Sequence, residues 1–369
     1  MHKIPFFIPS INEKDIGAVK KTLKKKWISQ GKINEKFEKE FAKNLKISSA
    51  KCVSVTNGFS ALYLASILCN LKKNDEVLIP TINFVASANI FSNLGAKVIF
   101  VDCESGLNPN ISISDLKKKL SKKTKVVVVM HYGGYPCNMN EIMNLKKKYK
   151  FKLIEDACHA VFSNYENKTL GTFGDYSAFS FYANKNLTSC EGGLIYCKKS
   201  SDAKKIRLLK NHGLNRTSLT HYTQKNSKYD VMYRGFNFRL DDVRSSMLLT
   251  QLNRLKKNNF LRFRLFKFYK KLLNNIKIHI LFNKFDKNDY SRHLFVISSK
   301  YKNTIIKKFK KQSIGFSQHY RPTHMLKAHK KNNNLKNSES FYKQSISLPI
   351  YPDLKIIHLK KICKVLNSI

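Results

Sequence analysis

The sequence predicts an α/β protein with a mostly parallel central sheet, helices on both faces of that sheet and a smaller α+β domain at the C-terminal end. Apolar runs of strand length alternate with segments of helical periodicity over much of the chain, an order typical of a doubly wound sheet. One of these runs, Val126 to Met130, is apolar at every position, as expected for a parallel strand covered on both faces.

The length of 369 residues suits one large domain and one smaller domain. We expect the large domain to cover residues 12–250 and the small domain residues 251–369, with residues 1–11 packed against the small one. A long basic helix, roughly 241–275, should link the two. In the small domain, the segments SRHLFVI and SISLPIYP are predicted strands.

The first elements of the large domain follow in a regular order. Residues 11–25 have helical periodicity, and the turn from Trp27 to Gly31 leads into an amphipathic helix. Cys52 to Val55 is a predicted strand, and a helix should begin at Gly58. The segment DEVLIPTINFVASANIFSNLGAKVIFVDCE then predicts a strand, a helix and a second strand, as a doubly wound sheet requires.

The chain is organised around residues 151–193, FKLIEDACHAVFSNYENKTLGTFGDYSAFSFYANKNLTSCEGG. The run from Phe151 to Ile154 predicts a buried strand, with Asp156 and then His159 at its C-terminal end, where open parallel sheets bind their ligands. A second apolar run, Tyr176 to Tyr182, leads directly to Lys185. This lysine is therefore predicted to lie in a turn between buried strands.

Lysine is so abundant here that Lys185 needs a reason to be singled out. The chain has 69 Lys and Arg residues and ten of them are Arg, which leaves 59 lysines, and nearly all lysines in a protein are solvated surface charges. A partly desolvated lysine loses its proton more readily and can form a Schiff base. A carboxylate such as Asp156 would keep the ring nitrogen of pyridoxal phosphate protonated. The linked pattern, rather than either residue alone, favours this chemistry.

The series IEDACHA and GTFGDYSAFSFYANKNLTSCEGG resembles the core signature of the DegT/DnrJ/EryC1/StrS family of sugar aminotransferases, fold-type I enzymes that use pyridoxal phosphate. The resemblance runs from about residue 5 to the end of the chain. It implies that Lys185 carries the cofactor and that Asp156 bonds its ring nitrogen. His159, where many relatives have Gln, would lie beside the phenolic oxygen, and Ser180 would bind the phosphate. A branch with His in place of this Lys acts as a dehydratase, whereas this chain keeps Lys.

Three further parts of the cofactor site follow from the resemblance. The turn at Gly58, Phe59 and Ser60 should hold the phosphate, because a glycine turn before a helix presents free backbone N–H groups to an anion. Phe59 replaces the usual small hydroxyl residue, a role that Ser60 could take. Phe84 would stack on the pyridine ring, although an aromatic residue at a helix start is more often core packing. Asn237, in the segment RGFNFRLDDVRSSMLLTQL, would reach the partner's cofactor phosphate across a homodimer interface.

The resemblance also indicates where substrates bind. The family's entry turn borders the sugar nucleotide, here Ile28, Ser29 and Gln30, although a plain loop is an equal alternative. The family's HY-x-P loop touches the sugar or nucleotide, here His319, Tyr320 and Arg321.

Arg239 could clamp the carboxylate of the amino donor in a two-pronged fashion. A helix cap, or a pair with Asp241 or Asp242, is an equal alternative. No metal site is expected, because His293, His319 and His324 lack a tight ligand motif.

The predicted activity is transfer of an amino group from an amino acid, with glutamate favoured, to a nucleotide-linked keto-deoxysugar. The motifs EDACHA, SRHLF and QHYRPTH resemble the branch that aminates C4 of UDP-linked 4-keto-6-deoxy-N-acetyl sugars for pseudaminic-type acids. Perosamine-type and 3-amino sugar branches stay open, and surface glycans are the expected destination. Two other classes are a non-catalytic sensor that keeps the fold and a charge-driven binder of nucleic acid or other polyanions.

Composition argues against the polyanion class. The net charge is +45, but the lysines are dispersed, whereas nucleic-acid binders usually cluster their charge on one face. Such dispersion indicates a compositional bias, which would still attract phosphorylated ligands. Eight cysteines without C-x-x-C pairs or a Cys/His metal spacing indicate reduced thiols, and no apolar run suits a signal peptide or a membrane span. We therefore expect a cytoplasmic protein. After the central stretch, the segment KKIRLLKNHGLNR is a predicted basic helix, and the polar segment Thr217 to Tyr229 that follows it is a predicted mobile loop.

Overall fold

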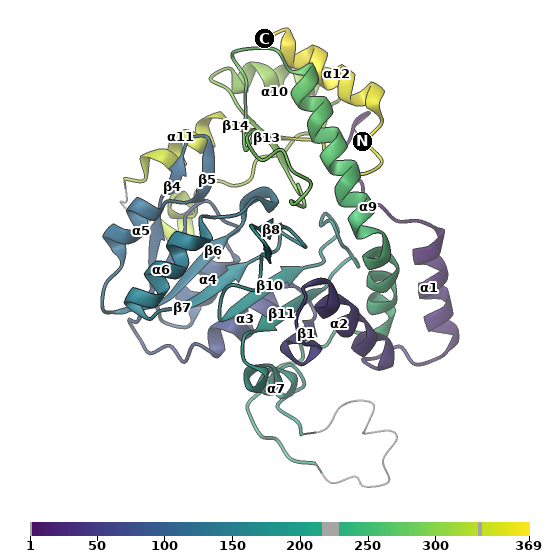
Figure 1. Cartoon of the computed structure of the whole chain (residues 1–369), viewed down its shortest axis with the longest axis vertical. Helices are drawn as coiled ribbons and strands as arrows, with labels where there is room; N and C mark the ends of the chain where they lie inside the picture. Colours follow the sequence, from purple (N-terminus) through teal and green to yellow (C-terminus); the bar gives the residue numbers. More distant parts are fainter. Residues whose placement is uncertain (1, 216–228, 331–333) are drawn as a thin grey trace.

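Seven strands form the central sheet of the computed structural model, which describes residues 2–215, 229–330 and 334–369 (Figure 1). Four neighbouring pairs are parallel, and the two pairs that involve β11 are antiparallel. This confirms the mostly parallel sheet. In spatial order the strands are β1 (Cys52–Val55), β11 (Gly193–Cys197), β10 (Tyr176–Ser180), β7 (Lys152–Asp156), β6 (Thr124–Met130), β2 (Glu76–Pro80) and β3 (Lys97–Val101).

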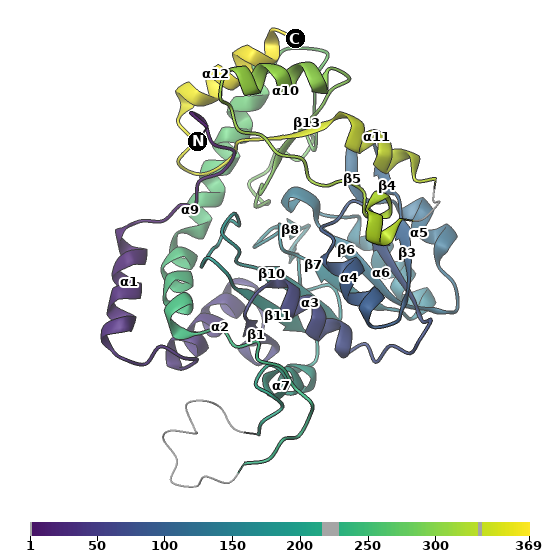
Figure 2. The same cartoon turned by 180° about the vertical axis from the view of Figure 1, so that it is seen from behind.

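Helices cover both faces of this sheet, because its strands are apolar on both sides (Figures 1 and 2). One apolar core lies between the sheet and α2 (Lys32–Asn44), α5 (Ile113–Lys119) and α6 (Met139–Tyr149). The other lies between the sheet and α3 (Gly58–Ile67), α4 (Ala86–Asn93) and α7 (Ser200–Leu209). Because both faces of the sheet are buried, its strands are held in place. The loops that follow the strand ends, which carry polar side chains, are thereby positioned.

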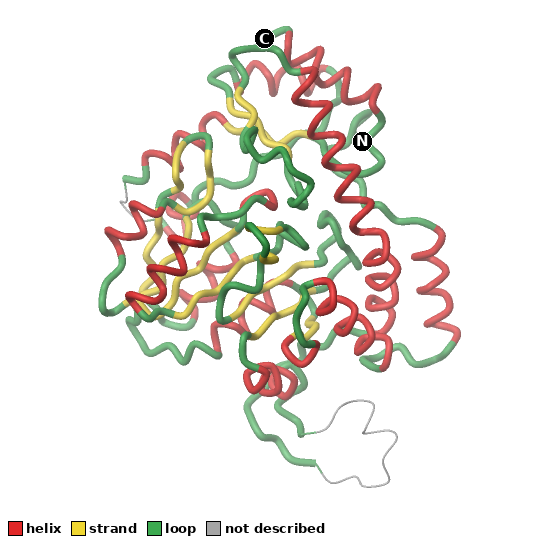
Figure 3. Tube along the Cα trace, in the orientation of Figure 1, coloured by secondary structure: helices red, strands yellow, loops and turns green. Residues whose placement is uncertain are grey.

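Helix α9 (Asp242–Leu272) runs from the sheet to a smaller C-terminal layer and packs along α1 (Glu13–Lys24) (Figures 1 and 3). That layer has its own apolar core, to which Ile4 belongs through a backbone bridge with Ile314. Because α9 continues without a break through residue 250, the boundary there stays a prediction. The layer contains β12 (His279–Ile280), β13 (Phe295–Ser298), β14 (Ser345–Leu348), α10 (Lys302–Lys311) and α12 (Ile356–Asn367).

The remaining elements are short. Two small antiparallel ladders join β4 (Cys103–Ser105) to β5 (Asn108–Ile111) and β8 (Asn164–Tyr165) to β9 (Lys168–Thr169). Helix α11 (Lys336–Gln344) packs on the first of them. Within the described ranges, no helix is both long enough and apolar enough to cross a membrane.

The basic helix expected over KKIRLLKNHGLNR is shorter than predicted. Helix α7 ends at Leu209, because the backbone turns to left-handed φ values of 57° at His212 and 76° at Gly213. The Gly213 N–H closes the helix end by donating to the Leu208 carbonyl at 2.8 Å. The loop predicted over Thr217 to Tyr229 lies outside the described residues, apart from Tyr229 itself.

Candidate active site

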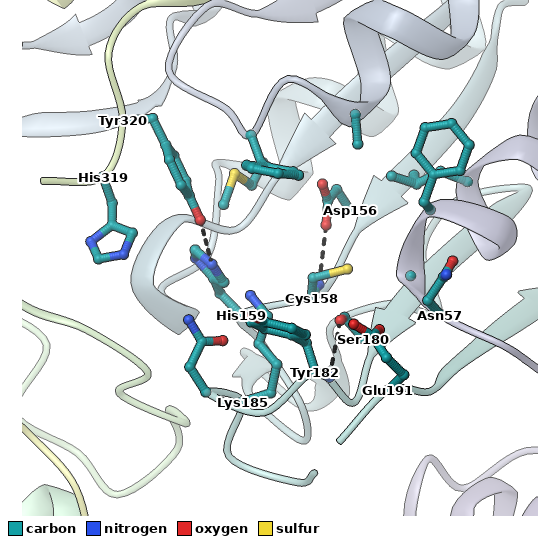
Figure 4. Close-up of a pocket in the computed structure, with 17 residues that line it drawn as sticks. Asn57, Asp156, Cys158, His159, Ser180, Tyr182, Lys185, Glu191, His319 and Tyr320 are labelled. Carbon is teal, nitrogen blue, oxygen red and sulfur yellow. Dashed lines mark hydrogen bonds between the residues drawn. The ribbon is translucent and has the colours of Figure 1, made fainter. Parts of the chain in front are cut away.

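A cavity of about 380 Å³ opens where three parallel strands end (Figure 4). Met130 ends β6, Asp156 ends β7 and Ser180 ends β10, so the sheet delivers one lining side chain from each strand. The apolar residues Leu62, Phe84 and Ala86 come from α3, from the turn before α4 and from α4 itself, in that order. The polar lining residues are Asn57, Asp156, Cys158, His159, Ser180, Tyr182, Asn184, Lys185, Glu191, His319 and Tyr320.

Lys185 lies in the turn between β10 and β11, as predicted, and its backbone N–H donates to the Tyr182 carbonyl at 2.9 Å. Its side chain lines the cavity, and no residue in the described part of the chain holds its ammonium group in a hydrogen bond or ion pair. Burial lowers the pKa of Lys185 below that of a solvated lysine, while Cys158 and Asp156 oppose the shift. The amine is therefore free to react with a carbonyl group.

Asp156 and its neighbour Glu155 point to opposite faces of β7, as alternation along a strand requires. Asp156 faces the cavity, and its Oδ1 accepts a hydrogen bond from the Cys158 N–H at 3.2 Å. Glu155 is fully buried, where it bonds His131 and accepts from the backbone N–H groups of Gly171, Phe173 and Gly174. Glu155 therefore has a structural role in buried hydrogen bonds, whereas Asp156 is available to a ligand.

The N-terminus of α3 forms an anion cradle beside Ser180. Asn57 caps this helix by accepting from the Ser60 N–H at 2.8 Å, and no acceptor in the described residues takes the N–H groups of Gly58 and Phe59. A Cβ at position 58 would lie 2.9 Å from the Ser180 Cβ, so only glycine leaves the approach open. The Ser180 oxygen accepts from the Tyr182 N–H at 3.4 Å, which leaves its own hydrogen for a ligand.

The opposite wall of the cavity carries aromatic and imidazole rings. The Tyr320 hydroxyl oxygen lies 3.0 Å from the Nε2 atom of His159 (Figure 4). The ring centroids of His159 and His293 are 4.3 Å apart. Burial and the nearby Lys185 lower the pKa of His319 to about 3 and hold the pKa values of His159 and His293 well below their ordinary range. These rings are therefore neutral near pH 7.

This set of groups fits pyridoxal phosphate. Lys185 offers an amine for its aldehyde carbon and Asp156 a carboxylate for its ring nitrogen, while the α3 cradle offers donors for its phosphate. Phe84 is 59% exposed, with its ring centroid 6.0 Å from that of Tyr320, so an aromatic face is available beside the ring. An amine, an acid and an anion cradle in one cavity are what this cofactor requires.

Several residues predicted for the site lie away from this cavity. The Ser60 hydroxyl is buried between Thr56 and Asn57, at 2.8 and 2.9 Å. Arg239 donates a hydrogen bond to the Asn211 side chain at 2.8 Å, whereas Asp241 forms an ion pair with Arg244. The predicted alternative, in which Arg239 pairs with Asp241 or Asp242, is therefore not observed. The other predicted residues outside the lining are Asn237 and Arg321, together with Ile28, Ser29 and Gln30 of the entry turn.

Gln30 lines a different cavity, of about 390 Å³, together with Glu38, Arg207 and Lys210. In that cavity Lys210 is 2% exposed and lies 3.7 Å from Glu38. The roles predicted for the entry turn, Asn237, Arg239 and Arg321 are not tested by this chain alone and stay predictions.

Sequence reasoning missed five polar lining residues, namely Asn57, Cys158, Tyr182, Asn184 and Glu191. Their signal was adjacency, because each is within about six residues along the chain of a predicted site residue. Asn57 also had a capping signal, since Asn before a glycine turn is a preferred helix N-cap. Among the described residues, no group of three or more His, Cys, Asp or Glu side chains could hold a metal ion.

Comparison with known proteins gives a consistent result. The model of the DegT/DnrJ/EryC1/StrS aminotransferase family matches residues 9–367. The GDP-perosamine synthase of Escherichia coli O157:H7 is 33% identical, over 76% of this chain and 74% of that protein. Among solved structures, Helicobacter pylori PseC, an aminotransferase involved in the biosynthesis of pseudoaminic acid, is 26% identical with a TM-score of 0.90, over 99% of this chain and 98% of PseC. Spr1654 from Streptococcus pneumoniae, solved in its PMP form, is 25% identical with a TM-score of 0.91. The match covers 99% of this chain and 98% of Spr1654.

Proposed function

Because the chain belongs to the DegT/DnrJ/EryC1/StrS aminotransferase family and is a pyridoxal phosphate-dependent sugar aminotransferase, we propose that it transfers an amino group from glutamate to C4 of a nucleotide-linked keto-deoxysugar. One observation carries the amino-transfer part of this proposal. The Lys185 amine has no fixed partner in the described residues and shares its cavity with the Asp156 carboxylate and the α3 anion cradle.

Each of these groups has a defined task in the proposed reaction. Pyridoxal phosphate supplies an electron sink for the carbon atom that exchanges a proton. Lys185 would hold the cofactor until the incoming amine displaces it, and the freed Lys185 amine would then move that proton, which its lowered pKa favours because the amine is more often unprotonated. Asp156 keeps the ring nitrogen protonated. Gly58, Phe59 and Ser180 bind the phosphate, and Phe84 packs on the ring.

The acceptor we propose is a UDP-linked 4-keto-6-deoxy-N-acetylhexosamine. The motifs EDACHA, SRHLF and QHYRPTH support this class, and PseC acts in the biosynthesis of a pseudoaminic acid. GDP-perosamine, named in the E. coli relative, is a nucleotide-linked sugar and supports the linkage, although with another nucleotide. Surface glycans are the proposed destination of the aminated sugar.

The test is a panel of purified UDP-, GDP- and dTDP-linked keto-sugars, with glutamate, glutamine, aspartate and alanine as donors. We expect amination of the UDP-linked 4-keto sugar with glutamate, and nuclear magnetic resonance of the product should locate the nitrogen at C4. A preference for a 3-keto sugar or for another nucleotide would contradict the proposed acceptor while leaving the transaminase itself intact.

A homodimer with shared active sites is also proposed. Asn237 is exposed, and the exposed apolar side chains of Ile11, Ile16 and Leu23 line a groove together with Cys190 and Met247. Exposed apolar groups of this kind favour contact with a second copy. In that arrangement Asn237 would reach the partner's phosphate, and Arg239 and the entry turn would border the substrate.

Subunit complementation tests the dimer. Lys185→Ala and Asn237→Ala chains should each be impaired alone. A refolded mixture should regain activity, because a mixed dimer rebuilds one complete site. Light scattering checks the mass. A monomer, or a mixture no better than the average of its two components, would overturn the shared site.

A further inference from the structure

The ring of His159 is fixed by a donor that cannot reverse its role. His159 is 3% exposed, and the backbone N–H of Gly133 lies 3.3 Å from its Nδ1 atom. A backbone N–H only donates, so Nδ1 must accept and carries no hydrogen. The position of Gly133, in the loop that follows β6, therefore selects one tautomer of a histidine that follows β7.

The proton of His159 is therefore on Nε2. Burial, together with Lys185, His293 and His319, holds the pKa of His159 well below its ordinary range, so the ring carries a single hydrogen near pH 7. With Nδ1 accepting, that hydrogen is on Nε2, which donates to the Tyr320 oxygen at 3.0 Å (Figure 4).

Tyr320 is left with a hydroxyl hydrogen that no group accepts in the described part of the chain. Its oxygen receives the bond from His159, and no other hydrogen bond involves it there. Burial raises the pKa of Tyr320 well above its ordinary range, so the hydroxyl stays protonated. Tyr320 lines the cavity between Phe84 and His319, with ring centroids 6.0 and 5.1 Å away, so its hydrogen is available to a ligand.

We propose that Tyr320, oriented by the Nε2–H tautomer of His159, donates a hydrogen bond to the carbonyl oxygen of the keto-sugar. This rests on the proposed function and deepens it. That oxygen is replaced by nitrogen and leaves as water, so it gains electron density as nitrogen adds to the carbon. A neutral donor aimed at this atom stabilises the developing charge. Tyr320 then binds substrate, and His159 positions Tyr320.

Separate half-reactions test the assignment to the sugar. Tyr320→Phe should slow delivery of nitrogen to a UDP-linked 4-keto-6-deoxy-N-acetylhexosamine by roughly tenfold to a hundredfold, the value of one hydrogen bond to a group gaining charge. Uptake of nitrogen from glutamate should change by less than about threefold. Tyr149→Phe, which removes a hydroxyl in α6, is the matched control and should leave both rates unchanged.

Equal loss in both half-reactions would mean that Tyr320 serves the cofactor, and an unchanged sugar half-reaction would mean that it has no role. Either result overturns the proposal. If the wild-type chain delivered nitrogen to no keto-sugar, the proposed function itself would fail, so the two failures are distinguishable.

The tautomer has its own readout, independent of turnover. In the cofactor-free protein with ¹⁵N-labelled histidine, the His159 signals should be those of a ring with hydrogen on Nε2 and none on Nδ1. The signal missing from the spectrum of His159→Gln assigns it. An Nδ1–H ring would overturn the proposal.

Two substitutions of His159 distinguish a role in positioning Tyr320 from a role in packing alone. Gln retains an N–H donor near the place of Nε2, so His159→Gln should keep most of the sugar half-reaction, whereas His159→Met should lose it as Tyr320→Phe does. Equal activity of the two variants would show that His159 acts through packing alone, which contradicts the proposed role.

Discussion

Two lysines with lowered pKa values, the half-buried Lys185 and the buried Lys210, differ in how the protein holds their amines. Lys210 is 2% exposed, donates to the Ser54 carbonyl at 2.8 Å and lies 3.7 Å from Glu38. Burial lowers its pKa to about 8, even though Glu38 opposes the shift. Lys185 also has a lowered pKa, but no group in the described residues binds its amine, which faces an open cavity.

The comparison teaches that burial and a lowered pKa do not by themselves mark a reactive lysine. A buried ammonium with fixed partners is part of a polar network, and removing it leaves those partners unsatisfied. An amine without fixed partners keeps its rotational freedom and its lone pair for a ligand. Removal of Lys185 is therefore expected to abolish activity without unfolding the protein, whereas removal of Lys210 is expected to lower stability.

The largest expected effect is on catalysis at Lys185. Lys185→Ala should reduce the turnover rate by at least about 10⁴-fold, because nucleophile and proton carrier are lost together. In the wild type, borohydride reduction should fix the cofactor covalently to Lys185. This adduct should be absent from Lys185→Ala, while the melting temperature stays near that of the wild type. Lys147→Ala, an exposed lysine on α6, is the control. A trapped adduct in Lys185→Ala would mean that another lysine holds the cofactor.

Asp156→Asn should have the next largest effect. Without the carboxylate the ring nitrogen is no longer kept protonated, and we expect kcat to fall by about 10²-fold to 10³-fold. Borohydride should still trap the adduct on Lys185, as seen by peptide mass spectrometry. Loss of the adduct together with the activity would mean that Asp156 acts in cofactor binding rather than in the chemistry.

Lys210→Met should act on stability instead. Removing one member of a buried network leaves the Glu38 charge with Arg207 and Ser54 alone, which should lower the free energy of unfolding by about 3 kcal/mol. Urea denaturation measures this, and Lys147→Met should change it by less than about 0.5 kcal/mol. A stable but inactive Lys210→Met would remove the distinction between the two lysines.

The pH dependence of stability gives the smallest effect. The folded-state pKa of Lys210, about 8, lies below the unfolded value of about 10.4. The folded state therefore binds fewer protons between these values, and the contribution of Lys210 to stability rises with pH in that window and is lost as pH falls through 8.

The stability difference between the wild type and Lys210→Met should accordingly widen by about 1 kcal/mol from pH 8 to pH 9. Urea denaturation at the two pH values measures it. A constant difference would mean that Lys210 is not the group that titrates.

Local patterns in the sequence predicted where Asp156, Lys185 and the start of α3 lie. The apolar run from Phe151 to Ile154 placed Asp156 at the end of β7, and the flanking apolar runs placed Lys185 in a turn, because both predictions depend on neighbours along the chain. The start of α3 at Gly58 followed from the glycine turn. These features needed no knowledge of distant segments.

Long-range contacts were beyond such reasoning. The bond between His159 and Tyr320 joins residues 161 positions apart, and nothing local indicates it. The partner of Arg239 is Asn211 rather than an adjacent aspartate, because the end of α7 brings Asn211 alongside it. Helix α7 itself was predicted too long, since the pattern of basic residues continues past the left-handed turn at Gly213.

The origin of Tyr320 has a practical consequence. Asp156 ends a strand of the central sheet and Lys185 lies in a turn between two of its strands. Tyr320 instead belongs to the segment that begins at Ile314, and the backbone of this segment pairs with Ile4 and with Ser347. If Tyr320 binds the sugar as proposed, a chimera that takes residues 314–326 from a relative would replace the wall that meets the incoming sugar and leave Lys185 and Asp156 in place. Acceptor choice in this scaffold would then be open to grafting.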